Sequence, residues 1–528
     1  MPNPSASSSR THSSITGERS WGVLLHPTSL PGDYFNGDLG HSARRFVDFL
    51  AAGGASWWQT LPTNPADPAG SPYSTASSFA GEPLLIDLED LIARGLLKRT
   101  ELGSIVGDSP RKVNYPAARK FRLAAHKTAY NRAKSSTDLL KSAAFKKFRT
   151  NQHHWLPDYA LFMALAKKYG TCDWTCWPQP FKQRQKAAMV AAAKELADDI
   201  AFVEFQQFIY DQQWLALRDY AASRKVRLIG DIPIFVSHQS ADVWSHQNIF
   251  CLKHDGKPEV VAGCPPDRFN AKGQLWGNAL YNWKALKSTG YEWWIARFER
   301  LLEHFDLIRL DHFIGFYRYW AVPSHARTAV RGKWRYTPGN DFFETAIRRL
   351  RNLPLIAEDL GLVTTEVVQL RERFGFPGMR IVQFGFSSGA DADHHKPHQY
   401  QIDSVVYTGT HDNETALGYL ERIKKESRTL KKGAHNELQT ACSYLGIEPR
   451  NLNAGPAAMI RTAFASVSSL AIIPMQDLLG LPASHRMNVP GTSSGNWTWR
   501  CLQSEVSPQL AKQLLQESSV FGRSKWRP

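Results

Sequence analysis

Short apolar runs recur along the chain, and stretches with helical spacing separate several of them. We predict a strand at each run, namely at 22–25, 57–61, 226–236, 307–311, 355–358, 405–410 and 470–474. Helices are predicted between them at 43–50, 293–304 and 365–374. Strands that are apolar throughout are typical of parallel sheets covered on both faces. The pattern therefore predicts an α/β fold, a (β/α)8 TIM barrel.

Residues from about 100 to 220 interrupt this alternation. Apolar positions recur there at helical spacing, most clearly at 160–168 and 186–211. We predict one barrel domain over 21–528, with a largely helical insertion at about 100–220. Residues 1–20 are rich in serine and lack an apolar stretch, so we expect a disordered tail rather than a secretory leader. This expectation favours a cytoplasmic location over a plastid.

Composition places the chain among ordinary soluble proteins, with 43% hydrophobic and 21% charged residues in 528. No apolar run reaches 18 residues, so no membrane partner is expected. The net charge of +16 would suit nucleic acid, but the basic residues concentrate in stretches such as 111–147 and 422–432, which are predicted to be helices with solvated faces. No nucleic-acid-binding motif accompanies them, and we expect no nucleic-acid partner.

Cofactor and metal signals are weak. Cys172 and Cys176 are four apart, but neither a second cysteine pair nor a nearby histidine completes a zinc site. No glycine-rich phosphate loop and no calcium-binding loop is present. His312 and His411 could in principle join nearby acids around a divalent ion, yet no close-spaced ligand motif supports this. We expect neither a cofactor nor a metal.

Acidic residues stand at or just beyond the ends of four predicted strands. They are Asp231, Asp311, Glu358 and Asp412. One acid after a strand is usually a helix cap or a turn residue. Barrel enzymes, however, place their chemistry at the carboxyl ends of strands. Four acids converging on one rim therefore predict an active site.

The neighbours of these acids suggest separate roles. Alternation along a strand puts Arg309 and Asp311 on one face, and likewise Thr408, Thr410 and Asp412. An arginine beside Asp311 favours its ionised form, which suits a nucleophile. Glu358 follows an apolar run, so desolvation would raise its pKa and make it a general acid. Two such carboxyls ~5–5.5 Å apart define retaining glycosidase chemistry, and we predict that spacing here.

These and further motifs resemble the amylomaltases, the bacterial and plastid 4-α-glucanotransferases, from about Trp21 to Arg500. The matching segments are GVLLHPTSLP (22–31), WWQ (57–59), SPY (71–73), GDIPIFV (230–236), AGCPPD (262–267), GQLWGN (273–278), DHF (311–313), IAEDLG (356–361), THDN (410–413) and RMNVPGT (486–492). Each is weak alone, but their order over the full length is specific.

This resemblance implies that Asp311 is the nucleophile, Glu358 the acid/base, and Asp412 the group that holds the donor sugar. It also implies substrate contacts from Tyr73, Asp231, Gln274, Trp276, Arg309, Phe384, His411 and Asn488. Cleft loops near 262–283 and 484–496 would carry Trp276 and Asn488 and exclude water, so that a sugar hydroxyl reacts instead.

The implied reaction moves a segment of an α-1,4-glucan to the 4-hydroxyl of glucose or another glucan. It would proceed by retaining double displacement through a glycosyl-aspartate, in a monomer or homodimer. The implied partners are α-1,4-glucans, maltooligosaccharides and glucose. One alternative is an α-glucan hydrolase that uses the same carboxylates with water as acceptor. A non-catalytic glucan-binding protein is disfavoured because all three acids are present.

Overall fold

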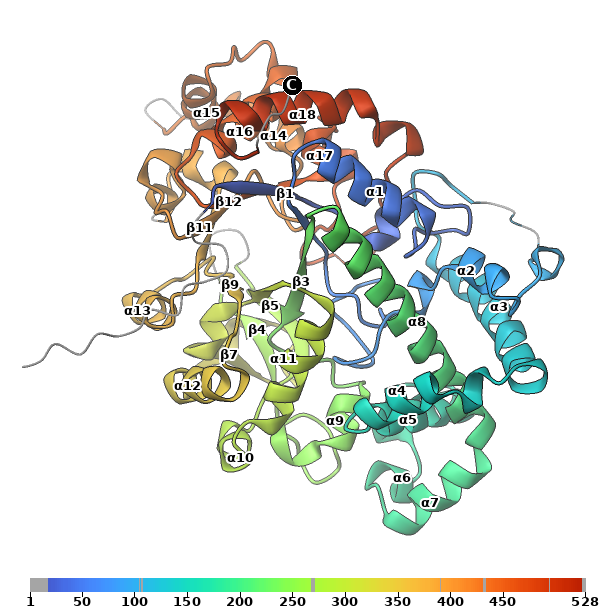
Figure 1. Cartoon of the computed structure of the whole chain (residues 1–528). Coiled ribbons are helices and arrows are strands. Elements are labelled where there is room, and N and C mark those ends of the chain that lie inside the picture. The colour runs from blue at the N-terminus through green and yellow to red at the C-terminus, as the bar shows by residue number, and fades with distance from the viewer. Residues whose placement is uncertain are drawn as a thin grey trace, which may run out of the picture.

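Within the residues described by the computed structural model, eight parallel strands close into a barrel (Figure 1). The described residues are 18–103, 105, 108–266, 271–389, 391–430, 434–492 and 494–524. Around the barrel the order is β1 (Ser20–Leu24), β12 (Leu470–Pro474), β11 (Ser404–Tyr407), β10 (Gly378–Ile381), β9 (Leu355–Ala357), β6 (Leu307–Asp311), β3 (Arg227–Pro233) and β2 (Trp57–Gln59). The predicted (β/α)8 fold is confirmed.

Seven of the eight barrel strands coincide with predicted apolar runs, and β10 does not. Its four residues, Gly-Met-Arg-Ile, include the half-buried Arg380, which interrupts the apolar pattern. The strand forms because Gly378 to Ile381 pair in parallel with β11. The formation of β10 therefore depends on pairing with a neighbouring strand, which the local sequence does not reveal.

Eighteen α-helices lie in the described residues. Those before β6 are α1 (His41–Ala52), α2 (Leu88–Ala93), α3 (Tyr115–Ser136), α4 (Ala143–Asn151), α5 (Leu156–Tyr169), α6 (Gln179–Lys182), α7 (Lys186–Glu195), α8 (Ala197–Ser223), α9 (Ala241–Ser245), α10 (Trp283–Ser288) and α11 (Glu292–His304). Those after it are α12 (Gly339–Leu350), α13 (Thr365–Arg373), α14 (Ala416–Ser427), α15 (Glu437–Leu445), α16 (Gly455–Ala465), α17 (Met475–Leu478) and α18 (Pro508–Val520). None is both long and apolar enough to span a membrane.

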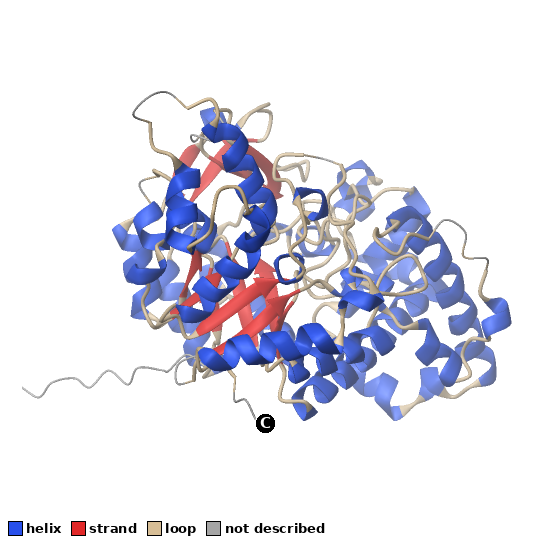
Figure 2. Cartoon of the chain, turned by 90° about the horizontal axis from the view of Figure 1, so that it is seen from above, coloured by secondary structure: helices blue, strands red, loops and turns tan. Residues whose placement is uncertain are grey.

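Helices α3 to α8 form a layer beside the barrel (Figure 2). The long helix α8 joins the two parts, and its middle is buried on most sides. Asp211 of α8 pairs with the Arg300 guanidinium at 2.7 Å and lies 3.0 Å from the His304 ring, both on α11. The Trp214 indole donates a hydrogen bond to the His304 carbonyl at 3.1 Å. This buried polar network fastens the helical layer to the barrel.

A second sheet lies outside the barrel and was not predicted. Its antiparallel strands run in the order β5 (Gln274–Ala279), β4 (Val260–Cys264), β7 (Arg318–Pro323) and β8 (Lys333–Tyr336). An isolated bridge between Val236 and Ala279 connects it to the segment after β3. The predicted cleft loop at 262–283 thus contains β5 and part of β4, and residues 267–270 lie outside the described range.

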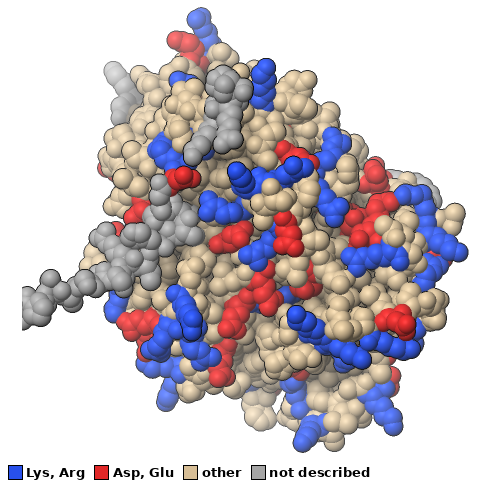
Figure 3. All heavy atoms as spheres, viewed as in Figure 1, with Lys and Arg blue, Asp and Glu red and all other residues tan. Residues whose placement is uncertain are grey.

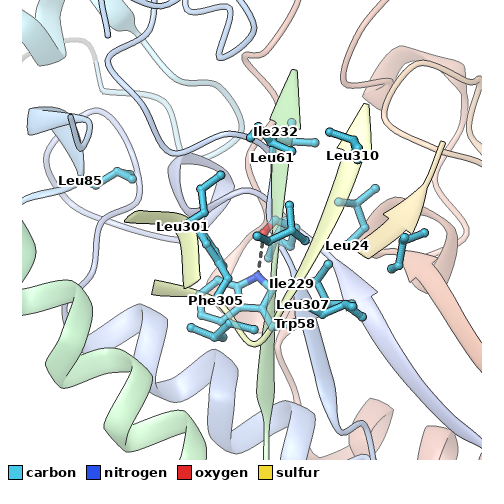
Figure 4. Packing of buried hydrophobic residues seen from close by; sticks show 14 of the residues in the cluster. Leu24, Trp58, Leu61, Leu85, Ile229, Ile232, Leu301, Phe305, Leu307 and Leu310 are labelled. Atoms are coloured by element: carbon cyan, nitrogen blue, oxygen red, sulfur yellow. Dashed lines mark hydrogen bonds between the residues drawn. The ribbon is translucent and has the colours of Figure 1, made fainter. Parts of the chain in front are cut away.

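The core lies between the barrel strands and the helices around them. Leu307 of β6 lies near Ile229 of β3 and the Phe305 ring, whereas Leu310 lies farther along the strand beside Ile232 (Figure 4). A Cβ on Gly230 would meet that ring at 2.6 Å, so only glycine allows Phe305 to approach β3 so closely. At the surface, basic and acidic side chains are interspersed in the view of Figure 3.

Candidate active site

The two acids predicted to do the chemistry lie on neighbouring strands. Asp311 ends β6 and Glu358 follows β9 directly. Leu310 pairs with Ala357 in the strand register, which makes Asp311 and Glu358 the next residues on strands about 4.8 Å apart. The Glu358 amide donates to the Leu310 carbonyl at 3.0 Å, so this register continues past the end of β9. Both carboxyls therefore emerge at one point of the rim.

Arg309 connects the acids of β3 and β6. Its Nη1 lies 2.8 Å from Asp231 Oδ1 and 2.9 Å from Asp311 Oδ1. Strand alternation predicted that Arg309 and Asp311 share a face, and these distances agree. Burial raises the pKa of Asp231, and the positive charge of Arg309 opposes that rise. The Asp311 side chain keeps 28% exposure, so it remains accessible to a substrate.

Glu358 occupies a different electrostatic environment. Desolvation by the surrounding protein and the charge of Asp311 raise its pKa well above the usual range of a glutamate. Arg309 and the His312 amide, which donates to Glu358 Oε2 at 2.7 Å, only partly offset this. Glu358 therefore keeps its proton to a higher pH than an ordinary glutamate, while Asp311 lies against a cation. The site thus contains one proton donor and one arginine-paired carboxylate.

Aromatic rings line the side of the site near Asp231. The Tyr73 hydroxyl donates to Asp231 Oδ2 at 2.5 Å, and its ring stacks on His411 with centroids 5.1 Å apart. Trp497 lies 5.7 Å from Tyr73 and 6.0 Å from His411. Trp497 was not predicted, because nothing in its local sequence distinguishes it from a core tryptophan.

Asp412 reaches the site from a turn rather than from a strand. Strand β11 ends at Tyr407, so the predicted alternation of Thr408, Thr410 and Asp412 on one face is wrong beyond that point. Asn488 Nδ2 donates to Asp412 Oδ1 at 2.7 Å, and the Asn488 amide donates to the His411 carbonyl at 3.1 Å. The segment at 484–496, of which residue 493 lies outside the described range, thus reaches Asp412.

Strand β5 brings two predicted substrate contacts to the other side. Trp276 Nε1 donates to Gln274 Oε1 at 3.1 Å, and its ring stands edge-on to His312 at 4.9 Å. Because the His312 backbone amide donates to Glu358 Oε2, His312 connects Trp276 to the proton donor. Phe384 packs its ring edge-on against His395 at 5.3 Å, and no ring contact or hydrogen bond among the described residues links its side chain to the three acids.

The described residues contain no group of three or more histidine, cysteine or acidic side chains arranged to hold a metal. Neutral histidine is favoured at His312, where burial lowers the pKa to about 4.

A TIM barrel that places a proton-holding carboxyl beside an arginine-paired carboxylate has the arrangement expected of a retaining glycoside-processing enzyme. Comparison with known proteins specifies the class further. A family model described as 4-alpha-glucanotransferase matches residues 25–504, and the chain belongs to this family. The resemblance to amylomaltases in the sequence is thereby confirmed.

Relatives match over nearly the whole chain. The 4-alpha-glucanotransferase of Thermus thermophilus is 42% identical over 501 residues, which cover 94% of this chain and 97% of the relative. The chloroplastic/amyloplastic 4-alpha-glucanotransferase of Solanum tuberosum is 40% identical, with 95% and 86% covered. Among solved structures, the amylomaltase from Streptococcus agalactiae in complex with acarbose has a TM-score of 0.89 at 33% identity, with 96% and 100% covered.

Proposed function

We propose that this chain is a 4-alpha-glucanotransferase that moves a segment of an α-1,4-glucan to the 4-hydroxyl of glucose or another glucan. The observation that carries the proposal is the pairing of Asp311 with Glu358 at one point of the barrel rim. Their opposite electrostatic environments provide a nucleophile and an acid. Membership of the 4-alpha-glucanotransferase family supports the same reaction.

In the first step, the Asp311 carboxylate attacks the anomeric carbon of the donor sugar. The bond from that carbon to the leaving 4-oxygen breaks, and Glu358 gives its proton to this oxygen. A glycosyl-aspartate and a shortened glucan result. The raised pKa of Glu358 supports this role, because the group must carry a proton when the step begins.

In the second step, Glu358 is an anion and takes the proton of the acceptor's 4-hydroxyl. The acceptor oxygen attacks the same anomeric carbon, and the bond to Asp311 breaks. Two inversions restore the α configuration, and both carboxyls return to their starting states.

The remaining predicted contacts would bind the sugars. Asp412, His411 and the Tyr73–Asp231 pair would hold the donor ring. Gln274, Trp276 and Asn488 would cover the cleft and keep water from the glycosyl-aspartate, so that a bound sugar hydroxyl reacts first. Phe384 would add an apolar surface for the acceptor. We also propose that the enzyme is a monomer or a homodimer and that it works in the cytoplasm, as expected from the sequence.

Incubation of the pure protein with maltotriose, with products separated by length over time, tests the function. A ladder of longer maltooligosaccharides together with glucose is the expected result. The variant Asp311→Asn, which keeps the size of the side chain, serves as the control and should form neither. Maltose and glucose alone would identify water as the acceptor and would replace the transferase by an α-glucan hydrolase.

A further inference from the structure

A buried carboxylate outside the reacting groups holds both ends of the segment that carries His411 and Asp412. Asp477 lies on α17, directly after β12, and only 2% of its surface is exposed. Its Oδ2 accepts a hydrogen bond from the Thr408 hydroxyl at 2.5 Å, and its Oδ1 accepts one from the Ala416 amide at 2.7 Å. Thr408 follows β11 and Ala416 begins α14, so one side chain ties the two ends of the turn together.

A carboxylate matches both bonds. Each of its oxygens accepts one hydrogen bond, whereas an asparagine in the same place could accept only one of them. Burial raises the pKa of Asp477 to about 6, and no cation of the described residues contributes to that pKa. The amino-terminal end of α14 offers only a partial positive charge. A buried charge without a cation is unfavourable, so simple packing does not explain this residue.

Part of the turn lines a small pocket. Thr410, His411, Asn413 and Glu414 line that pocket together with Asp477 and Arg486. Other contacts restrain the middle of the turn. Asn488 donates to the His411 carbonyl and to the Asp412 carboxyl. Arg486 donates to the Asp412 carbonyl, and Gln383 Nε2 donates to the Glu414 carbonyl at 3.0 Å. Asp477 differs from these residues because its side chain bonds to both ends of the turn, where it leaves β11 and where it enters α14.

We propose that Asp477 is a positioning residue that sets the placement of His411 and Asp412 against the donor sugar. This inference rests on the proposed transferase function. His411 stacks on Tyr73 at 5.1 Å, and Asp412 is held by Asn488 at 2.7 Å, so a shift of the turn would disturb both contacts. Contacts that tighten as the sugar ring distorts affect the transition state more than substrate binding. The loss should therefore fall on kcat, with little change in KM.

Thr408→Val removes the hydroxyl that donates to Asp477, and Asp477→Asn replaces the charged acceptor at Oδ2 by an amide nitrogen that can only donate to the Thr408 oxygen. For maltotriose disproportionation we expect each variant to lower kcat about tenfold, the factor that corresponds to one hydrogen bond to a charged group, and to change KM less than twofold. The double variant should be about as active as either single variant, because both changes act on the same interaction. Thr408→Ser keeps the hydroxyl and should restore most of the rate. If Asp477→Asn does not fold, the comparison of Thr408→Val with Thr408→Ser decides alone.

Asp242→Asn is the matched control. Asp242 is also buried, burial also raises its pKa to about 6, and it accepts the Ser78 amide at 2.7 Å, but it bonds to no part of the turn at 408–416. It should lose thermal stability yet keep kcat within about twofold. Wild-type kcat in both Asp477→Asn and Thr408→Val, or an equal loss of kcat in Asp242→Asn, would overturn the positioning role. If the wild-type enzyme forms no oligosaccharide longer than maltotriose, the transferase function is overturned, and the positioning role with it.

Discussion

Replacing Glu358 by glutamine removes the proton donor while keeping the size of the side chain and an oxygen for the His312 amide, which lies 2.7 Å from Glu358 Oε2. Maltotriose has a poor leaving group, so its cleavage depends on that proton. General acid catalysis contributes about 10²- to 10⁴-fold, and Glu358→Gln should lower kcat on maltotriose by that factor, about 2.7–5.5 kcal/mol of activation free energy.

A donor that needs no proton separates the two steps. With an α-maltooligosyl fluoride, the first step should stay within about tenfold of the wild-type rate, because fluoride leaves without a general acid. Sodium azide should then accelerate turnover of Glu358→Gln, because azide attacks the glycosyl-aspartate without losing a proton. The product should be the α-glycosyl azide, since two inversions retain the configuration.

The pH dependence of the same variant follows from the raised pKa of Glu358. Wild-type activity should fall as the pH rises through that pKa, because the acid form is lost. The fluoride reaction of Glu358→Gln should lack this alkaline decline. Asp359→Asn is the control: this neighbouring buried acid pairs with Arg371 at 3.2 Å, so the change should reduce stability rather than remove the acid step. A Glu358→Gln rate on maltotriose near that of the wild type, or a β-azide product, would refute the reasoning.

Three further outcomes are expected. Asn488→Ala removes the 2.7 Å bond to Asp412 and should lower the initial rate on maltotriose about tenfold, whereas an unchanged rate would separate Asn488 from the donor site. Trp276→Ala opens the cleft and should raise the ratio of hydrolysis to longer products, measured by chromatography; a constant ratio would argue against a water-excluding role. Burial lowers the pKa of His126 to about 3, so the folded chain keeps it neutral while the unfolded chain takes up a proton below pH about 6.5. The free energy of unfolding therefore falls as the pH falls, by up to about 1.4 kcal/mol per pH unit from this one group. Denaturant titrations between pH 6.5 and 5 should show a weaker pH dependence of the unfolding free energy in His126→Gln than in the wild type. An equally steep dependence in the variant would contradict this.

The sequence predicts the barrel well because most of its strands are mainly apolar and buried, as β12 is throughout its length. The second sheet escaped prediction because β5 and β8 are largely exposed, β5 has no regular alternation, and β8 alternates polar and aromatic residues over only four positions. β5 pairs with β4 and β8 pairs with β7, which are their neighbours along the chain, and the pairing of β4 with the distant β7 joins the two hairpins into one sheet.

The active site likewise has some residues that the sequence predicts and others that it does not. Acids at strand ends are visible in the sequence because strand register fixes where they emerge. Asp412 lies beyond its strand, in a turn whose shape depends on Asp477, a residue 65 positions away. Neither Asp477 nor Trp497 has a local signal that separates it from a cap or a core residue. Such contacts depend on how distant segments meet, and no local pattern records them.

The barrel closes between its first strand and its last strand along the chain, and this has a consequence for synthesis of the enzyme on the ribosome. Strand β1 pairs with β12, residue by residue from Ser20 with Leu470 to Leu24 with Pro474. At a synthesis rate of roughly 5–20 residues per second, the ribosome needs about 20–90 s between these two strands. Until then β1 has one free edge and the rim is an open arc. A chain released early, or stalled before β12, would carry both reacting acids and still lack the enclosed site, so activity should appear only at the very end of translation.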